Sequence, residues 1–436
     1  MLIKASYIIT MGRKGVIKDG YLAFDEEGKI TYVGKEKPDE EDVLNLGGRI
    51  IIPGLINAHT HVAMTILRGL KDDVVLSEWL YNYIFPAEAR LKADDVYWGT
   101  LQGIAEMIES GTTAFADMYF FEEKIADAVV ESGVRANLSR GTLDIDKTVE
   151  EAIKEEIDFL NYVEKLWSKD KKLRDRIVYF FGPHAPYTCS KELLAKIKEL
   201  ADEKKLGIHI HLAETKWELE EIKKKVGMSP VEYLDSIGIL TERTLAAHVV
   251  WTSDKDLDIL AQRGVSVAHN PTSNLKLASG IARVPDMLKR GINVAIGTDG
   301  PASNNRLDML MEMRMAALIH KGYLLNPTVV TAEDVMRMAT INGAKAIGME
   351  KITGSLDEGK YADFVVINPK KVLQGTPIHD IFSMIIYALD LRAIEAVYVG
   401  GKKIYENGEF LTIRIDKVKE KVQEIRERLE EEIKSS

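Results

Sequence analysis

Histidines in this sequence recur at positions where a metal ion could be bound. Seven of the nine lie at or just after the ends of short apolar runs: His59, His61, His184, His209, His211, His248 and His269. Alternate residues of a strand point to the same face, so His59 and His61 can share one ion. Asp299 follows the last apolar run of this series, in Gly-Thr-Asp-Gly. Three histidines and one aspartate suit zinc or another borderline divalent ion.

Other interpretations of these residues are more ordinary. A single histidine is more often a hydrogen-bonded core residue than a ligand, and only the combination favours a metal site. The other two histidines, His320 and His379, fall on a predicted helix and loop, and we expect no catalytic role for them. Glu214 comes three residues after His211. A carboxylate placed there would lie beside the metal and could move protons, although by itself it would pass for a helix-terminal residue.

Eight apolar runs of strand length alternate with longer amphipathic stretches between residue 55 and about residue 350. The runs are Leu55–His61, Thr112–Asp117, Val134–Arg140, Ile177–Gly182, Gly207–His211, Leu245–His248, Val265–His269 and Ile292–Ile296. This alternation is typical of repeated βα units around a parallel sheet, and eight strands favour a closed (β/α)8 barrel. The carboxyl ends of barrel strands form one rim, which would gather the histidines and Asp299.

The two ends of the chain have a different pattern, with short strands and turns. We expect residues 1–53 and 353–412 to form one small β domain, a β-sandwich, beside the barrel of residues 54–352. Residues 413–436 should contain a charged amphipathic helix, with Val418, Val422, Ile425 and Leu429 along one side. This stripe is expected to pack on the chain's own barrel or β domain; a contact in a homo-oligomer is the alternative.

Composition excludes several classes of protein. The net charge of −10 disfavours nucleic-acid binding, which needs clustered Lys and Arg. A single cysteine, Cys189, rules out a disulfide within the chain and suits a reducing compartment. No signal peptide is evident, and no apolar run reaches the roughly 18 residues of a membrane helix. We therefore expect a cytoplasmic protein with no membrane partner.

Several segments carry a resemblance to a known family. Pro53–His61, His211–Glu214 and Gly297–Gly300 resemble the amidohydrolase superfamily, in its aminohydrolase branch. Four further segments are similar to the 5′-methylthioadenosine/S-adenosylhomocysteine deaminases: Phe85–Glu88, Leu138–Gly141, Gly182–Tyr187 and Gly297–Asn305. The resemblance extends from about residue 2 to residue 412. It implies an α/β fold, a TIM-type (β/α)8 barrel with a β-sandwich built from both chain ends, and hydrolytic deamination of 5′-substituted adenosines.

The resemblance also implies roles for individual residues. His59, His61, His211 and Asp299 would bind one divalent metal ion, expected to be zinc. Glu214, His248 and Asp299 would handle protons during attack of water on C6 of adenine, with Glu214 protonating N1. The small-molecule nucleoside would be bound by Glu88 at the ribose hydroxyls, by His184 at the purine and by Arg140 at its far end, with Glu214 and Asp299 also in contact.

One departure from the pattern bears on the substrate. Some relatives carry a second arginine on the loop after the position of Arg140, whereas no arginine lies between Arg140 and Arg174 here. A homocysteine carboxylate would lose part of its contact, so we expect 5′-methylthioadenosine to be preferred over S-adenosylhomocysteine. The apolar segment Leu76–Phe85, with Trp79, Tyr81 and Tyr83, is expected to line a slot for the thioether.

Three interpretations of the activity remain at this stage. The first is the adenosine-type deaminase. The second is another hydrolase on the same scaffold, such as a guanine deaminase or a triazine hydrolase, which needs no ribose contact. A noncatalytic metal-binding protein is a third interpretation, but it leaves the placement of Glu214 and His248 to coincidence. A second metal is not expected, because binuclear relatives use a lysine at the end of the fourth strand and residues 177–184 contain none.

Overall fold

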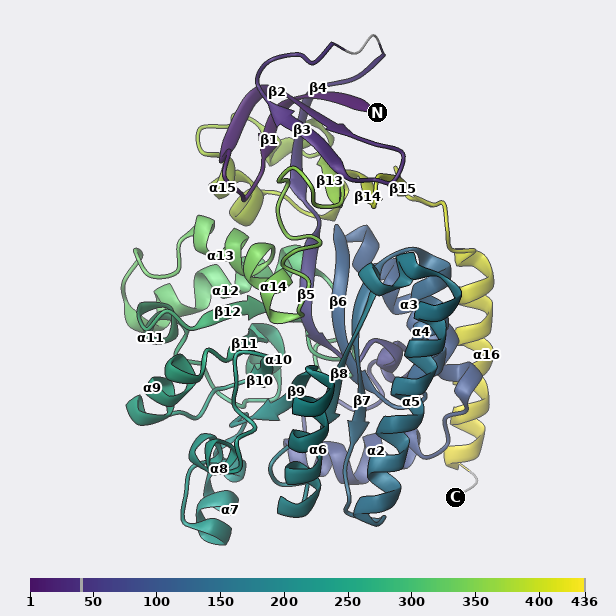
Figure 1. Ribbon diagram of the computed structural model, residues 1–436, viewed down its shortest axis with the longest axis vertical. Helices are drawn as coiled ribbons and strands as arrows, with labels where there is room; N and C mark the ends of the chain where they lie inside the picture. Colours follow the sequence, from purple (N-terminus) through teal and green to yellow (C-terminus); the bar gives the residue numbers. More distant parts are fainter. Residues whose placement is uncertain (40–41, 435–436) are drawn as a thin grey trace.

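The computed structural model describes residues 1–39 and 42–434, whose strands form two eight-stranded sheets (Figure 1). The first is a mixed sheet made from both ends of the chain. In spatial order its strands are β16 (Glu409–Phe410), β15 (Lys402–Glu406), β14 (Ile394–Val399), β13 (Phe364–Ile367), β4 (Val43–Pro53), β1 (Leu2–Ile9), β2 (Val16–Phe24) and β3 (Ile30–Gly34). β1 and β4 are parallel, and the other pairs are antiparallel.

The second sheet is parallel and runs in sequence order around a nearly closed barrel. Its strands are β5 (Leu55–Thr60), β6 (Thr112–Tyr119), β7 (Arg135–Thr142), β8 (Ile177–Pro183), β9 (Gly207–Leu212), β10 (Thr244–His248), β11 (Ser266–His269) and β12 (Asn293–Ile296). Just beyond β12, the Asp299 N–H donates to the carbonyl of His59 at 2.9 Å, which joins the last strand to the first. The predicted eight-stranded barrel is confirmed, and most of its strands are buried on both faces, as helix-covered parallel strands should be.

Helices surround the barrel, and several of them begin at a residue whose side chain caps the first turn. The longer ones are α3 (Ala93–Glu109), α4 (Glu122–Ser132), α5 (Val149–Lys169), α6 (Lys191–Lys204), α7 (Lys216–Val226), α8 (Pro230–Ile237), α9 (Asp254–Arg263) and α12 (Met309–Leu324). Short ones are α1 (Leu76–Glu78), α2 (Phe85–Glu88), α10 (Pro271–Lys276), α11 (Val284–Lys289), α13 (Ala332–Met338), α14 (Ile341–Ala346) and α15 (Ile381–Ser383). A capping box opens α13, where the Thr331 N–H donates to the Asp334 side chain at 2.8 Å.

The mixed sheet covers the amino ends of the barrel strands. β4 passes through Gly54 directly into β5, so the two sheets share one strand path (Figure 1). A buried ion pair adds to this junction: Arg135, at the start of β7, donates to Asp363 at 2.6 and 3.0 Å. The carboxyl ends of the barrel strands therefore face away from the mixed sheet.

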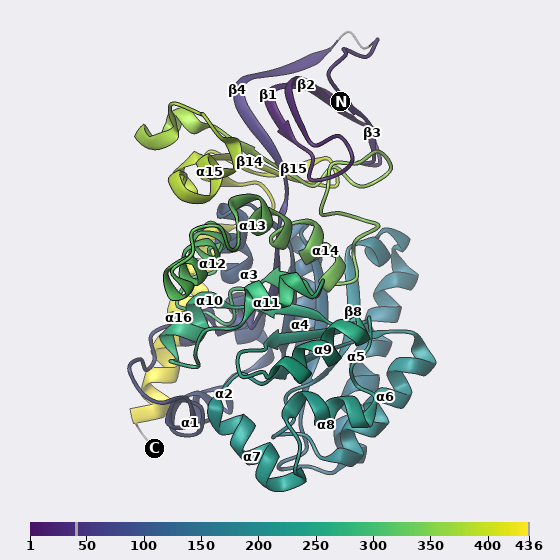
Figure 2. The same cartoon turned by 90° about the vertical axis from the view of Figure 1, so that its left-hand side faces the viewer.

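The last helix, α16 (Ile415–Lys434), lies along the side of the barrel against α3 (Figures 1 and 2). Val418, Ile425 and Leu429 are buried there, and Arg428 forms an ion pair with Asp95 of α3. The predicted apolar stripe thus packs on the chain's own barrel. Among the described residues, no helix is long and apolar enough to cross a membrane.

Candidate active site

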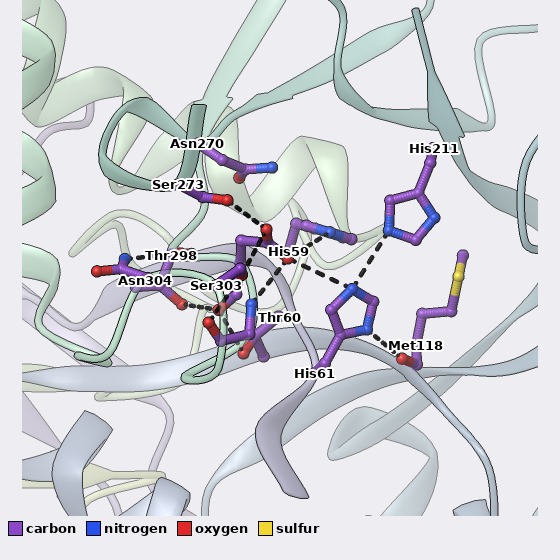
Figure 3. Close-up of polar contacts among 12 residues, drawn as sticks. His59, Thr60, His61, Met118, His211, Asn270, Ser273, Thr298, Ser303 and Asn304 are labelled. Carbon is purple, nitrogen blue, oxygen red and sulfur yellow. Dashed lines mark hydrogen bonds and ion pairs between the residues drawn. The ribbon is translucent and has the colours of Figure 1, made fainter. Parts of the chain in front are cut away.

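Side chains of metal-ligand type converge at the carboxyl end of the barrel. His59 and His61 leave the end of β5, His211 that of β9, and Asp299 follows β12. The Asp299 Oδ1 atom lies 3.4 Å from His59 Nε2 and 3.3 Å from His61 Nε2. The Nε2 atoms of His61 and His211 face each other at 3.2 Å (Figure 3).

The second nitrogen of each of these rings has a partner elsewhere, and for His61 and His211 that partner is a backbone carbonyl, which fixes the tautomer. His61 Nδ1 donates to the carbonyl of Met118 at 2.5 Å, and His211 Nδ1 donates to that of His184 at 2.8 Å. His59 Nδ1 lies 2.8 Å from Nε2 of the buried His209. With the protons on Nδ1, all three Nε2 lone pairs point to one place, as in metal-binding histidines.

These residues fit a bound cation. His59 Nε2 is buried and has no hydrogen-bond partner among the residues that the structure describes. Burial lowers the pKa of His59 to about 3 and holds that of His211 well below its usual range, so both rings are neutral and suited to bind a cation. One ring nitrogen each of His59 and His61 and one carboxylate oxygen of Asp299 lie within 4.8 Å of one another. Ring nitrogens of His59, His211 and His248 form a second group of the same size. The chain therefore has a buried His/Asp metal site.

Asp299 is kept ionised and correctly aimed by its surroundings. Although burial alone raises the pKa of its carboxyl, the neighbouring His59, His248 and His61 bring the net pKa well below the usual range. Its Oδ2 accepts from Ser273 at 2.5 Å and from Ser303 at 2.8 Å, and its Oδ1 accepts the Gly300 N–H at 2.8 Å. Both serines appear in Figure 3.

Glu214 and His248 lie together beside this centre. His248 Nε2 is 3.9 Å from Glu214 Oε2, while its Nδ1 donates to Asn274 at 2.8 Å. Burial raises the pKa of Glu214. Burial lowers the pKa of His248, but the Glu214 and Asp299 carboxylates outweigh this and raise it above the usual value. Both shifts favour the protonated form of the group concerned.

A cavity of about 830 Å³, counting its open mouth, leads to these groups. One side is apolar and comes from the predicted segment: Leu76, Trp79, Leu80, Ile84 and Phe85. Tyr81 and Tyr83 are not among the lining residues that the structure describes, and Tyr81 is 53% exposed. The segment Leu76–Phe85 was expected to line a slot for the thioether. Its apolar residues do line the cavity, but these two tyrosines are not part of the described wall.

Glu88 lies in the same wall and is bonded to a residue that the sequence did not single out. The Tyr119 hydroxyl donates to Glu88 Oε1 at 2.7 Å. Burial raises the pKa of Glu88 to about 7, and the bond from Tyr119 opposes this only in part. Glu88 can therefore accept from or donate to a hydroxyl group in the cavity.

The other two predicted substrate residues differ in position. His184 lines the cavity, and its Nδ1 is 2.9 Å from the Thr188 hydroxyl; burial lowers its pKa to about 4, so the ring is neutral. Arg140 precedes the wall residue Gly141, and its Nη2 donates to Glu155 at 2.8 Å. Lys147 binds the same carboxylate at 2.9 Å, so both nearby cations are already paired.

Some supporting residues were missed by sequence reasoning. Asp117 accepts the Val62 N–H at 2.6 Å, and Glu122 accepts the Tyr119 N–H at 2.7 Å, on either side of the His61 contact with Met118. Burial raises the pKa of Asp117 to about 8. Their only sequence signal was a polar residue at or just after the end of a strand.

Two histidines lie away from this centre. His320 lies on α12 and is buried, and its Nε2 is 3.3 Å from Nε2 of His269. His379 lies on an exposed bend. Cys189 is buried and free, and burial raises the pKa of its thiol to about 12, which makes it a poor nucleophile.

Comparison with known proteins agrees with this geometry. Residues 50–404 match the Amidohydrolase family. The chain is 47% identical to the 5-methylthioadenosine/S-adenosylhomocysteine deaminase of Thermococcus sibiricus, over 93% of each chain. It is 45% identical to the 5′-deoxyadenosine deaminase of Methanosarcina mazei, over 98% of each. A crystal structure of an adenosine deaminase from Xanthomonas campestris with bound zinc has a TM-score of 0.91 at 32% identity, over 98% of each chain.

Proposed function

This chain belongs to the amidohydrolase family, and from that premise we propose that it hydrolyses the amino group from 5′-substituted adenosines, releasing ammonia. One observation carries the proposal: three histidines and ionised Asp299 converge at the end of a cavity that also contains Glu214, His184 and Glu88. The chemistry is hydrolysis of a C–N bond in a cyclic amidine. The product would be the corresponding inosine derivative.

His59, His61, His211 and Asp299 would hold one divalent ion, and we propose zinc because its preferred ligands are nitrogen and carboxylate oxygen. When bound, such an ion makes a strong nucleophile available at neutral pH by lowering the pKa of water. The chain's own contribution is orientation. Asp299 and His248 would accept hydrogen bonds from the attacking water, since Asp299 is ionised and His248 Nδ1 is occupied by Asn274.

Glu214 would move the proton to the purine. Ser279 donates to its Oε1 at 3.2 Å, which leaves Oε2, on the His248 side, to carry the proton. A carboxyl with a raised pKa can be protonated when substrate binds and can donate to N1, so that negative charge does not build up on the ring. His248 could then supply the proton that the departing amino group needs.

The walls of the cavity favour small apolar 5′ substituents. His184 would contact the purine, Glu88 the ribose hydroxyls, and the Leu76–Phe85 wall the 5′ group. Glu155, which already binds Arg140 Nη2, would compete with a distal substrate carboxylate for this guanidinium. We therefore propose 5′-deoxyadenosine and 5′-methylthioadenosine as better substrates than S-adenosylhomocysteine.

A comparison of kcat/KM tests the proposal. Ammonia release should be measured with 5′-deoxyadenosine, 5′-methylthioadenosine, S-adenosylhomocysteine and adenosine, with guanine and a chlorotriazine as counter-substrates. Turnover of guanine or the triazine alone would replace the proposed function with one of the alternatives on this scaffold.

Glu155→Gln sharpens the substrate test. Removing this charge frees Arg140 and Lys147, so kcat/KM for S-adenosylhomocysteine should rise several-fold while that for 5′-methylthioadenosine stays unchanged. The matched control is Glu150→Gln on the exposed side of α5. Equal effects on both substrates would show that Arg140 does not bind the substrate carboxylate.

A further inference from the structure

Glu214 follows a strained turn. Between β9 and α7 the chain passes through Ala213, whose φ of +53° lies in the left-handed region that non-glycine residues seldom adopt. The Ala213 carbonyl accepts the N–H groups of Val250 and Trp251, at 3.0 and 2.9 Å. Its own N–H and that of Glu214 point the other way and need a separate acceptor.

That acceptor is Glu218. Its carboxylate is fully buried in the first turn of α7, where Oε1 accepts the Ala213 N–H at 2.8 Å and Oε2 accepts the Glu214 N–H at 2.9 Å. The backbone of Glu218 is itself fixed, because its N–H donates to the Thr215 hydroxyl at 3.1 Å. One side chain thus binds both amides of the strained turn.

Burying the Glu218 carboxylate is energetically unfavourable, which indicates that its hydrogen bonds have a role. Burial raises the pKa of Glu218 to about 7, although the two N–H donors lower it. Both partners are donors, so a protonated carboxyl would lose one of the two bonds. A buried carboxylate is unfavourable unless hydrogen bonds offset its loss of water, and here the two N–H groups of the turn supply those bonds.

We propose that Glu218 is a positioning residue for deamination: it clamps the Ala213–Glu214 turn and thereby aims the Glu214 carboxyl at the purine. The inference rests on the proposed function of Glu214. Glu218 itself is buried behind the turn and is absent from the described lining of the cavity. It acts through the backbone of Glu214.

Glu218→Gln tests the clamp. A glutamine oxygen can accept from only one of the two N–H groups, and its amino group faces the other donor. At a temperature well below Tm we expect kcat to fall 10- to 100-fold, with KM and bound metal unchanged within about twofold. Glu220→Gln, an exposed glutamate on the same helix, is the matched control and should behave like wild type. An unchanged kcat for Glu218→Gln would overturn the proposal.

A double-mutant cycle shows whether Glu218 works through Glu214. In a Glu214→Gln background the further change Glu218→Gln should alter kcat by less than twofold. Full additivity of the two effects would overturn the proposal. If Glu218→Gln lowers Tm close to the assay temperature, Ala213→Gly is added, because glycine tolerates the positive φ; kcat should still be reduced.

Hydrogen exchange separates this inference from the proposed function. In Glu218→Gln the amides of Ala213 and Glu214 should exchange at least 10-fold faster than in wild type, with the amides of α7 unaffected. This readout needs no turnover. Absence of ammonia release from every adenosine by the wild type would refute the function alone, whereas unchanged exchange at both amides would refute the clamp alone.

Discussion

At the scale of single residues, the metal-facing histidines differ in what holds them. His61 and His211 each donate to a backbone carbonyl, which stays an acceptor at any pH. His59 Nδ1 instead lies 2.8 Å from Nε2 of another imidazole, His209, whose Nδ1 lies 3.4 Å from the Ser139 hydroxyl. Burial holds the pKa of His209 well below its usual range, so this ring stays neutral and can accept the His59 Nδ1–H.

His209→Leu should weaken metal binding while leaving the fold intact. The substitution removes the acceptor of the His59 Nδ1–H, and loss of such a partner typically reduces metal affinity 10- to 100-fold. Chelator competition followed by elemental analysis measures this. The control is His320→Leu, another buried histidine paired with a histidine but outside the site. Equal affinity in both variants would show that His209 does not support His59.

Glu214→Gln should retain metal and fold but lose turnover. Glutamine keeps the shape and the Ser279 contact but cannot donate an acidic proton, and loss of a general acid costs on the order of 10² to 10⁴ in rate. The measurements are kcat, metal content and Tm. Near-normal kcat would contradict the proton-transfer role.

Sequence reasoning predicted residues such as His59, His61 and Asp299 because strand ends of a barrel share one rim. It could not predict that Arg140 pairs with Glu155, since the direction of a long side chain depends on neighbours from other elements. Nor could it single out Glu218, which looks like any glutamate in the first turn of a helix.

At the scale of elements, a buried carboxyl joins α5 to β8. Glu156 is fully buried, accepts the Gly182 N–H at 3.0 Å and contacts the Tyr179 hydroxyl. Burial raises its pKa to about 7. The folded state therefore keeps a proton that the unfolded chain releases near pH 4.5, so this group lowers stability as pH rises from about 4.5 to about 7, with no further change above.

Glu156→Gln should remove that dependence. Glutamine resembles the protonated acid, accepting from Gly182 and donating to the Tyr179 oxygen. We expect the variant to be more stable than wild type at pH 8, on the order of 1 to 3 kcal/mol, and equal to it at pH 4. Denaturant unfolding at both values measures the difference. The same gain at pH 4 would point to packing rather than to the proton.

The C-terminal helix was predicted from its apolar stripe, and the structure places that stripe on α3. Ile425→Ala should lower the free energy of unfolding by about 2 kcal/mol or more, because a buried methyl-rich side chain is removed. Lys419→Ala, on the exposed side, should have little effect. The sequence showed that the stripe must be covered but did not identify α3 as its partner.

At the scale of the whole molecule, Arg135 and Asp363 join the barrel to the mixed sheet. Asp363→Asn leaves the buried guanidinium without its charge partner, and such a loss costs about 3 to 5 kcal/mol. Asp390→Asn, which breaks the exposed pair with Arg392, should cost less than about 1 kcal/mol. Thermal unfolding compares the two. The pair spans 228 positions in sequence, and no sequence pattern could have predicted it.

The mixed sheet also constrains how the chain is made. β4 pairs with β13, which begins at Phe364, 311 residues after Pro53. At about 5 to 20 residues per second, the ribosome needs about 15 to 60 s to deliver that partner. Throughout this interval the nascent chain presents one edge of β4 with free N–H and C=O groups beside the apolar residues Ile50, Ile51 and Ile52. An unpaired apolar edge recruits other strands, so newly made chains should be most prone to aggregate before β13 emerges, and chaperones that bind extended apolar segments should act on residues 43–53.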